Sequence, residues 1–261
     1  MLKFLIVALA MSMTAACSTA PPVTDAIRSE LAPSGQLRAG MNLGNALFTQ
    51  KDPATGALRG VSVDLMRELG SRLGVPVEFV VYDTPGQVAD AAESGAWDVA
   101  VLAIEQARAR TIAFSPPMTE IEATYVVHRD SPLHAAAQVD GAGVRIAASE
   151  KAGYELYLTR TVRNATLLRP KGFPAAVELF NARGADALAA LKPQLLESTA
   201  MLPDARMVEG NFMIVNHGLG TPRDRPAAAA YLQAFVTDLV GSGFIARSIA
   251  GSGVQGLSAV K

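Results

Sequence analysis

The stretch from Gly95 to Arg108 constrains the fold of this chain more than any other. Gly95 ends an amphipathic segment, and residues 98–104 form an apolar run with the length of a buried strand. Glu105 then opens a short polar turn that leads to Arg108. An arginine that follows a buried strand stands where open α/β sheets collect ligands, and its planar guanidinium suits a carboxylate. The alternative is a surface arginine in a solvated turn.

Length and charge exclude several classes of partner. The chain has 261 residues, half of them hydrophobic, which is enough for one large domain or two small ones. Its net charge of −1 and the lack of a basic run argue against nucleic acid or an anionic membrane surface as partner. No interior segment approaches the roughly 20 apolar residues that cross a bilayer. We expect a monomer.

The amino end is typical of an export signal. Residues 1–16 contain a basic start, an apolar core and a small-residue cleavage site, and Cys17 follows at once. This resembles the bacterial lipoprotein signal, in which that cysteine is lipidated, although Thr14 stands where leucine is usual. The alternative is ordinary cleavage with an incidental cysteine. Either way we expect export, no internal disulfide because no second cysteine exists, and a flexible tether over residues 17–34.

Helical and strand patterns alternate along the rest of the chain, which predicts parallel sheets with covering helices. Thr84 and Pro85 are typical of a helix start, and Pro226 begins the clearest amphipathic helix. Strands are expected at 36–40, 77–82, 98–104, 124–128, 144–147, 167–168, 186–191 and 212–217, helices at 64–73, 85–95, 153–163, 173–181, from Lys192 and from Pro226, and a loop over 218–225.

Two successive α/β cycles predict two lobes. We assign residues 35–121 and 218–261 to lobe 1 and residues 122–217 to lobe 2. Extended segments near residues 121–125 and 213–218 are expected to connect them.

Several passages follow one shared pattern: Gly60–Leu65, Leu73–Val80, Gly95–Asp98, Arg108 six residues before Phe114-Ser115, and Ala123–Val127. Together they resemble a periplasmic substrate-binding protein of an ABC importer, in solute-binding family 3, the polar amino-acid binders. The resemblance covers roughly residues 36 to 254 and is densest in lobe 1. It implies a type II fold of two α/β lobes with two crossover strands, a ligand in the cleft between lobes, and an inner-membrane permease as partner. It also implies that Arg108 matches the arginine that holds the ligand carboxylate.

The chain departs from the family where an amino group would be bound. Glu105 replaces a threonine, Val101 and Ala103 replace hydroxyl-bearing residues, and no acid stands at Leu191-Lys192. The opening signature also differs, with Val61 and Ser62 after the glycine. We therefore expect a small solute with a carboxylate, and expect analogues without the amino group to bind comparably to amino acids.

Further candidates accompany Arg108 in the ligand site. Asn42 and Asn45 match a loop that faces the ligand in the family, and the alternative is plain turn residues. Gly153 and Tyr154 open a predicted helix whose free N–H groups could bind an anion, or the tyrosine belongs to the core. Lys192 could add a second positive contact, or be a solvated lysine.

Three functions remain open on this sequence. The first is an exported receptor of an ABC importer. The second is an enzyme on the same fold, as in cyclohexadienyl dehydratases, with Glu105 as a general acid beside the carboxylate site. The third is the input domain of a sensor. We expect no catalytic residues, no metal site and no cofactor, since no histidine shows metal-ligand spacing and no phosphate-binding glycine loop is present.

Overall fold

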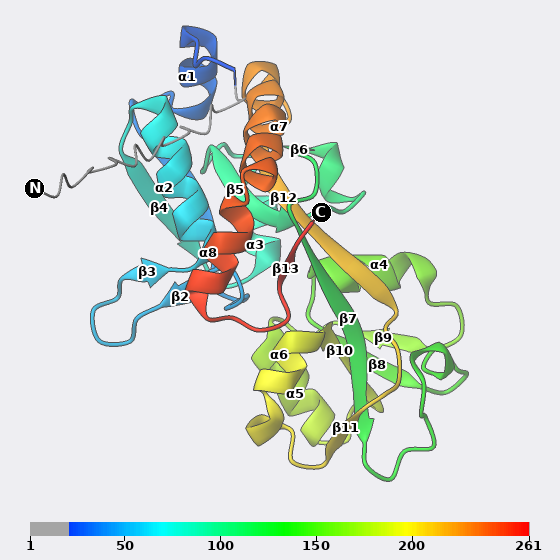
Figure 1. The fold of residues 1–261 in the computed structure, drawn as a ribbon. Helices are drawn as coiled ribbons and strands as arrows, with labels where there is room; N and C mark the ends of the chain where they lie inside the picture. The colour runs from blue at the N-terminus through cyan, green and yellow to red at the C-terminus, as the bar shows by residue number, and fades with distance from the viewer. Residues whose placement is uncertain (1–20, 261) are drawn as a thin grey trace, which may run out of the picture.

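Two α/β lobes make up the protein in the computed structural model, which describes residues 21–260 (Figure 1). The helices are α1 Asp25–Leu31, α2 Val61–Leu73, α3 Pro85–Asp90, α4 Gly153–Thr161, α5 Phe173–Asn181, α6 Lys192–Glu197, α7 Pro226–Gly241 and α8 Phe244–Ser252, with short 3-10 turns η1 Arg108–Arg110, η2 Ala136–Gln138 and η3 Thr199–Met201. The strands are β1 Leu37–Asn42, β2 Gln50–Lys51, β3 Leu58–Arg59, β4 Val77–Tyr82, β5 Val99–Ala103, β6 Ile112–Phe114, β7 Thr119–His128, β8 Arg145–Ala148, β9 Thr166–Leu168, β10 Ala187–Leu191, β11 Ala205–Met207, β12 Met213–Pro222 and β13 Ser258–Ala259.

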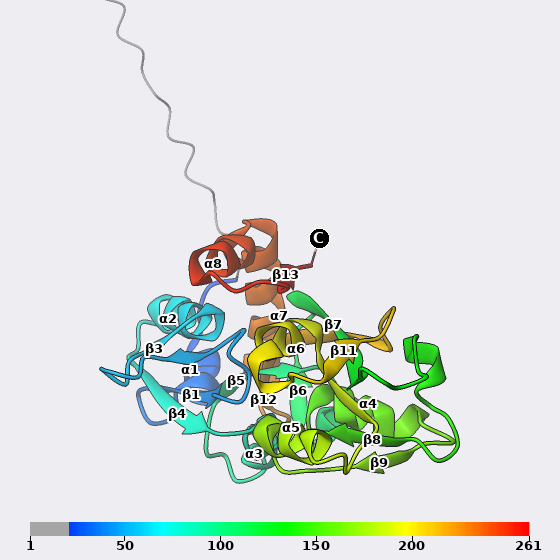
Figure 2. The same cartoon turned by 90° about the horizontal axis from the view of Figure 1, so that it is seen from below.

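One strand order runs through both lobes: β4-β1-β5-β12-β7-β10-β8-β9. In lobe 1, strands β4, β1 and β5 are parallel, and in lobe 2, strands β10, β8 and β9 are parallel. Helices α2, α7 and α8 lie with lobe 1, and α4, α5 and α6 lie with lobe 2 (Figures 1 and 2). The predicted two-lobed fold with mostly parallel sheets is confirmed.

The long strands β7 and β12 each pass from one lobe to the other. Residues 119–123 of β7 pair with residues 213–217 of β12, antiparallel. Beyond this shared segment β7 pairs with β10 and β11, whereas β12 pairs with β5 and β6. These are the crossover strands expected for the fold. The lobe boundaries assigned from the sequence stay a proposal.

The loop predicted for residues 218–225 is wrong in its first half. Strand β12 continues to Pro222, and Gly218 and Gly220 lie within it. A Cβ atom on Gly220 would come within 2.5 Å of Ile112 Cγ2, so glycine here allows close packing of β6 against β12. The glycines mark a close approach of strands, not a loop.

Part of the predicted tether is folded. Residues 25–31 form helix α1, which Thr24 caps by accepting a hydrogen bond from Ile27 N. Ile27 and Leu31 are buried, and the helix packs against α7. Apolar residues spaced by four give this helix a buried face, which the polar residues around it obscure in the sequence. Cys17 and the signal segment lie outside the described residues.

Each lobe anchors its parallel strands with the same charged contact. Asp98, just before β5, accepts hydrogen bonds from the backbone N of Arg38 at 2.9 Å and from its guanidinium at 3.1 and 2.7 Å. Asp186, just before β10, accepts from the backbone N and guanidinium of Arg145 at 2.8, 3.0 and 2.8 Å. In each pair the arginine carbonyl accepts from the aspartate N. The two lobes thus share a framework that the sequence does not show as a repeat.

Helix α7 buries the face predicted for it. Tyr231, Leu232, Phe235, Val236 and Leu239 are all buried.

Within residues 21–260, no helix is by itself long and apolar enough to cross a membrane. Helices α7 and α8, bent by 70° at their junction, reach that length and composition only together.

Candidate ligand-binding cavity between the lobes

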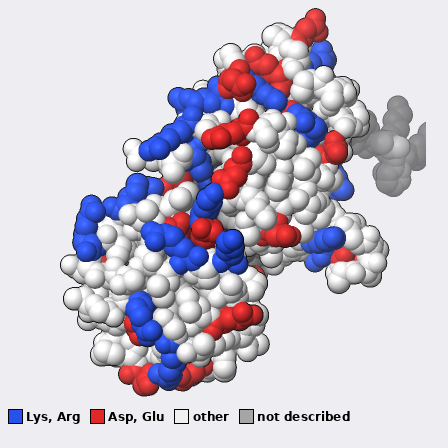
Figure 3. Space-filling model, turned by 180° about the vertical axis from the view of Figure 1, so that it is seen from behind, with Lys and Arg blue, Asp and Glu red and all other residues white. Residues whose placement is uncertain are grey.

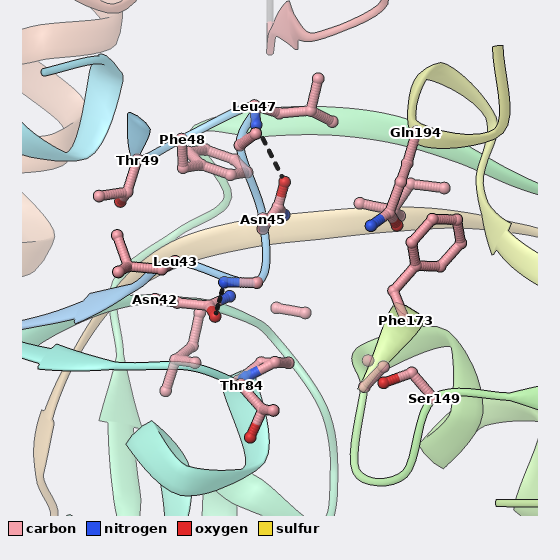
Figure 4. A pocket seen from close by; sticks show the side chains of 18 of the residues that line it. Asn42, Leu43, Asn45, Leu47, Phe48, Thr49, Thr84, Ser149, Phe173 and Gln194 are labelled. Atoms are coloured by element: carbon pink, nitrogen blue, oxygen red, sulfur yellow. Dashed lines mark hydrogen bonds between the residues drawn. The ribbon is translucent and has the colours of Figure 1, made fainter. Parts of the chain in front are cut away.

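A cavity of about 540 Å³ lies between the two lobes. Lobe 1 lines it with the loop after β1, the end of β5 and the turn that carries Arg108, and lobe 2 with the starts of α4 and α5 and the end of β10. Figure 4 shows the β1 loop on one side and Phe173 and Gln194 on the other. The principal lining residues are Asn42–Thr49, Ser62, Thr84, Val101–Ala103, Arg108, Ser149, Ala152–Tyr154, Lys171–Pro174, Leu191, Gln194, Glu197, Val215 and His217.

Arg108 enters this cavity from η1 as a buried charge. Its side chain donates from Nη1 to the carbonyl of Ala103 at 3.0 Å and from Nη2 to the carbonyl of Lys151 at 2.9 Å. Its Nε is buried and has no hydrogen-bond partner among the described residues. Burial lowers the pKa of Arg108 to about 10, so the guanidinium stays protonated at neutral pH.

No carboxylate in the described part of the chain forms an ion pair with Arg108, although the residue is only 5% exposed. Asp90 and Glu105 are close enough to raise its pKa, but Asp90 pairs with Lys151 at 2.6 Å and Glu105 with Arg160 at 2.5 Å. A buried charge ordinarily has a charged partner. Arg108 therefore presents an unneutralised positive charge to the cavity.

Glu105, expected beside the ligand, does not line the cavity. Its buried carboxylate turns to Arg160 on α4 and joins the two lobes there. Lys151 makes two more inter-lobe contacts, through its ion pair with Asp90 and through its carbonyl, which accepts from Arg108. The lobes thus touch each other beside the cavity, and the Glu105 side chain serves that contact.

Lys192, the expected second positive contact, also lies away from the cavity. It forms an ion pair with Glu122 of β7 in a separate groove of lobe 2. The neighbouring residue at the end of β10, Leu191, lines the cavity instead. Strand β10 ends at Leu191 and helix α6 begins at Lys192, whose side chain turns to Glu122 instead of the cavity.

Asn42 and Asn45 both line the cavity, and their contact with a ligand stays a prediction. The Asn42 Oδ1 atom accepts from Gly44 N at 3.0 Å, and the Asn45 Oδ1 atom accepts from Leu47 N at 3.2 Å (Figure 4). These Asx-type contacts hold the loop and leave the amide Nδ2 hydrogens as donors.

Gly153 and Tyr154 also line the cavity, at the start of α4. A Cβ atom on Gly153 would lie 2.5 Å from Ala103 Cβ, so glycine lets this helix start approach β5. Tyr154 is buried, which raises the pKa of its hydroxyl, and Ser149 offsets part of that rise. The side chain therefore acts as a neutral wall of the cavity.

His217 is one of several lining residues that the sequence did not predict, together with Phe48, Ser149, Phe173 and Gln194. It lies on β12 and packs its ring 4.6 Å from that of Phe48. Burial, and then the charge of Arg108, lower its pKa to about 3, so the ring is neutral. Its Nδ1 is buried without a hydrogen-bond partner in the described structure. Histidine spacing gave no signal, because the strand pairing that places it here is long-range.

Charge is distributed unevenly over the cavity lining. Asp83, Lys171 and Glu197 are exposed, whereas the buried lining is apolar or neutral apart from Arg108. On the face shown in Figure 3, acidic and basic side chains are interspersed. Within residues 21–260, no group of His, Cys, Asp and Glu could hold a metal ion.

The fold and cavity define a class: a two-lobed protein with a deep cavity between the lobes that carries a buried arginine. The sequence of residues 37–250 matches the family profile described as bacterial extracellular solute-binding proteins, family 3. The chain belongs to this family. A search of curated proteins found no match.

Several solved structures of similar fold are amino-acid-binding proteins. Holo ArgBP from T. maritima shares 20% identity, with a TM-score of 0.68 over 81% of this chain and 93% of that one. AbpA from Streptococcus pneumoniae, an amino acid ABC transporter substrate-binding protein bound to L-arginine, shares 19%, with a TM-score of 0.71 over 85% and 96%. The ancestral amino acid-binding protein AncCDT-1, a precursor of cyclohexadienyl dehydratase, shares 20%, with a TM-score of 0.69 over 85% and 97%. At these identities the likeness establishes the fold.

Proposed function

We propose that this protein is an exported receptor that binds a small carboxylate-bearing solute between its lobes and presents it to an ABC importer. The observation that carries the proposal is Arg108, a buried cavity residue whose charge no described side chain neutralises. A ligand carboxylate would supply the missing negative charge.

The free donors of Arg108 fit that role. Two of the five N–H groups of the guanidinium are engaged by the carbonyls of Ala103 and Lys151, which fix its plane. Nε and the remaining Nη hydrogens are left for a ligand. Because the side chain is already desolvated and held, binding a carboxylate needs little further ordering.

The opposite wall argues against an obligatory amino group on the ligand. Leu191 lines the cavity at the end of β10, where the family resemblance implies an acid. Glu197, the acid that lobe 2 contributes to the described lining, is exposed at the rim. A buried ammonium group without a carboxylate partner is costly, so the proposed ligand is an organic acid, or an amino acid bound without a strong ammonium contact.

The relatives support solute binding and an importer as partner. ArgBP and AbpA are solved with arginine, and a binding component from Wolinella succinogenes is solved with lysine. AbpA is described as part of an ABC transporter. We propose the same partner class here, a membrane permease, and a periplasmic location with an anchor at Cys17.

An enzyme on this fold is the second candidate, because AncCDT-1 links an amino acid-binding protein to a dehydratase that descends from it. The general acid considered for this chain is Glu105. Because its carboxylate is outside the cavity and paired with Arg160, it does not face a bound substrate. The receptor is therefore the function that the geometry supports.

A thermal-shift screen of carboxylic acids and amino acids tests the proposal. A ligand at 100 times its dissociation constant should raise the free energy of unfolding by about 2.7 kcal/mol. Small-angle scattering of the protein should give a smaller radius of gyration with the stabilising ligand than without it, because the lobes close on the ligand. Conversion of the stabilising ligand to a product would favour the enzyme. If no carboxylic acid in the screen stabilises the protein, a carboxylate receptor is contradicted.

The anchor is tested separately by Cys17→Ser. Loss of the lipidated cysteine should move the protein from the membrane fraction to the soluble periplasmic fraction. The wild type should carry a lipid label that the variant lacks. Unchanged fractionation with no label on the wild type would contradict lipidation and leave the receptor proposal intact.

A further inference from the structure

Three buried polar atoms of the cavity lining have no partner in the described structure: Oγ1 of Thr49, Nε of Arg108 and Nδ1 of His217. The Thr49 hydroxyl can donate or accept, so it selects no particular partner, whereas Arg108 and His217 make more specific demands. The Arg108 and His217 side chains are both more than nine-tenths buried, at 5% and 6% exposure. Buried polar atoms in native proteins are almost always hydrogen-bonded, so each of these calls for a partner. A ligand in the cavity is available to both.

The two side chains stand next to each other. His217 on β12 is the register partner of Ala103 on β5, and the Ala103 carbonyl accepts from Arg108 Nη1. The charge of Arg108 is also close enough to lower the pKa of the His217 ring. One small molecule can therefore reach both groups with neighbouring atoms.

The two groups need opposite partners. Arg108 only donates, so it requires an acceptor. The neutral ring of His217 has one donor and one acceptor nitrogen, and the backbone carbonyl of Val215 faces the ring. Since a carbonyl only accepts, the tautomer whose N–H points to Val215 leaves the other ring nitrogen as an acceptor. That nitrogen requires a donor on the ligand, close to the group that Arg108 binds.

We infer that the ligand is a hydroxy acid: its carboxylate binds Arg108, and a hydroxyl on the adjacent carbon donates to His217. This inference rests on the proposed carboxylate site. A hydroxyl supplies the donor without adding charge, so the bound pair of ligand and Arg108 is neutral. The ammonium of an amino acid also donates, but it leaves a net positive charge in a lining whose described buried residues include no acid.

The rest of the lining selects an apolar body for this acid. Phe48 packs against His217. Phe173 lies on the side of the cavity opposite Phe48 (Figure 4). Leu43, Leu47 and Leu191 complete an apolar wall. The inferred class is therefore a 2-hydroxy acid with an aromatic or branched aliphatic side chain.

Calorimetry on a matched series tests the inference. Phenyllactate, 3-phenylpropanoate and phenylalanine share one skeleton and carry a hydroxyl, a hydrogen and an ammonium group next to the carboxylate. The leucine skeleton gives a second series: 2-hydroxy-4-methylpentanoate, 4-methylpentanoate and leucine. In the better-binding series, the hydroxy acid should bind about tenfold more tightly than the unsubstituted acid, and the amino acid no more tightly than the unsubstituted acid.

His217 variants separate a specificity role from a structural one. His217→Phe keeps the aromatic contact with Phe48 but removes the acceptor, so the ratio of hydroxy-acid affinity to unsubstituted-acid affinity should fall from about ten to about one. His217→Gln, which restores an acceptor, should recover part of the tenfold preference.

The outcomes distinguish this inference from the proposed function. Equal binding of hydroxy and unsubstituted acids by the wild type overturns the role of His217 and leaves the Arg108 site standing. Tightest binding of the amino acids overturns the hydroxy-acid class as well. Failure of every acid in both series to bind overturns the carboxylate site on which the inference rests.

Discussion

In lobe 1 the carboxylate of Asp98 clamps Arg38 at the start of the parallel strands, and in lobe 2 the carboxylate of Asp186 clamps Arg145 with the same set of hydrogen bonds. At the other ends of the same strands the lobes differ. The chain after β5 delivers the buried charge of Arg108 to the cavity, whereas β10 ends at the apolar Leu191.

The contrast separates the charges that hold the fold from the charge that is left for a ligand. Asp98 is fully buried and pairs with two arginines, Arg38 and Arg225, so its charge is neutralised within the protein. Arg108 is also buried, at 5% exposure, but no acid among the described residues pairs with it. Burial alone therefore does not mark a functional residue, and burial without a partner, at the ligand-collecting ends of the strands, does.

The largest loss of stability is expected from removing the buried acid of the lobe 1 clamp, with the lobe 2 clamp as the comparison. Asp98→Ala leaves Arg38 and Arg225 without their shared acid and should lower the free energy of unfolding by about 3–5 kcal/mol. Asp186→Ala should cost no more than about 1 kcal/mol, because the Asp186 side chain is 38% exposed. Urea unfolding measures both. Equal losses would contradict the view that the lobe 1 clamp contributes more because it is buried.

The pH dependence of stability tests the cavity end of lobe 1. The pKa of His217 is about 3 in the fold and 6.5 when unfolded, so below pH 6.5 the unfolded chain takes up a proton that the folded protein excludes. Stability should therefore fall as pH falls, by an amount on the order of 2 kcal/mol between pH 7.5 and pH 5.

His217→Phe is the matched control for that titration. Urea unfolding at pH 7.5 and pH 5 should show that the variant loses about 2 kcal/mol less free energy of unfolding than the wild type. The other titrating groups are common to both proteins, so the difference reports His217. An identical pH dependence in wild type and variant would mean that the imidazole is not held neutral beside Arg108.

A smaller effect, on ligand preference, is expected from adding a negative charge at the cavity end of β10 in lobe 2. Leu191→Asp places an acid at the end of β10, facing the cavity. It should raise the affinity for phenylalanine relative to 3-phenylpropanoate by about tenfold, because the acid can pair with the ammonium group. Lys192→Gln is the control, since Lys192 pairs with Glu122 outside the cavity. A ratio that does not change in Leu191→Asp would contradict the assignment of that wall.

Local patterns in the sequence predict much of the fold. The amphipathic spacing in α2 and α7 and the apolar run of β5 depend on residues close together in the chain, so they can be interpreted one segment at a time. The sequence prediction ends β12 too early because Gly218 and Gly220 resemble loop residues. Glycine is needed at these positions because other segments come close: Ile112 and Phe114 of β6 approach Gly220, and Ile104 and Ser115 approach Gly218. These segments are about one hundred residues away in the sequence.

The sequence predicts the cavity only where its residues follow local rules. Asn42 ends β1, Asn45 follows it by three residues and Arg108 follows β5 by five, and all three line the cavity. Glu105 and Lys192 instead form ion pairs with residues far away in the sequence, Arg160 and Glu122. These long-range pairs turn both side chains away from the cavity. His217 enters through the pairing of β12 with β5, which no spacing in the sequence records.

Titration calorimetry on Arg108 variants tests the central claim most directly. With the tightest-binding carboxylate from the screen as ligand, Arg108→Ala should bind about a hundredfold more weakly or worse, since charge-assisted hydrogen bonds and a buried counter-charge are both lost. Arg108→Lys should recover part of the loss, because an ammonium group cannot make the paired contact of a guanidinium. Circular dichroism should show both variants folded. If Arg108→Ala binds the acid as tightly as the wild type, the buried arginine is structural and the ligand site has been assigned wrongly.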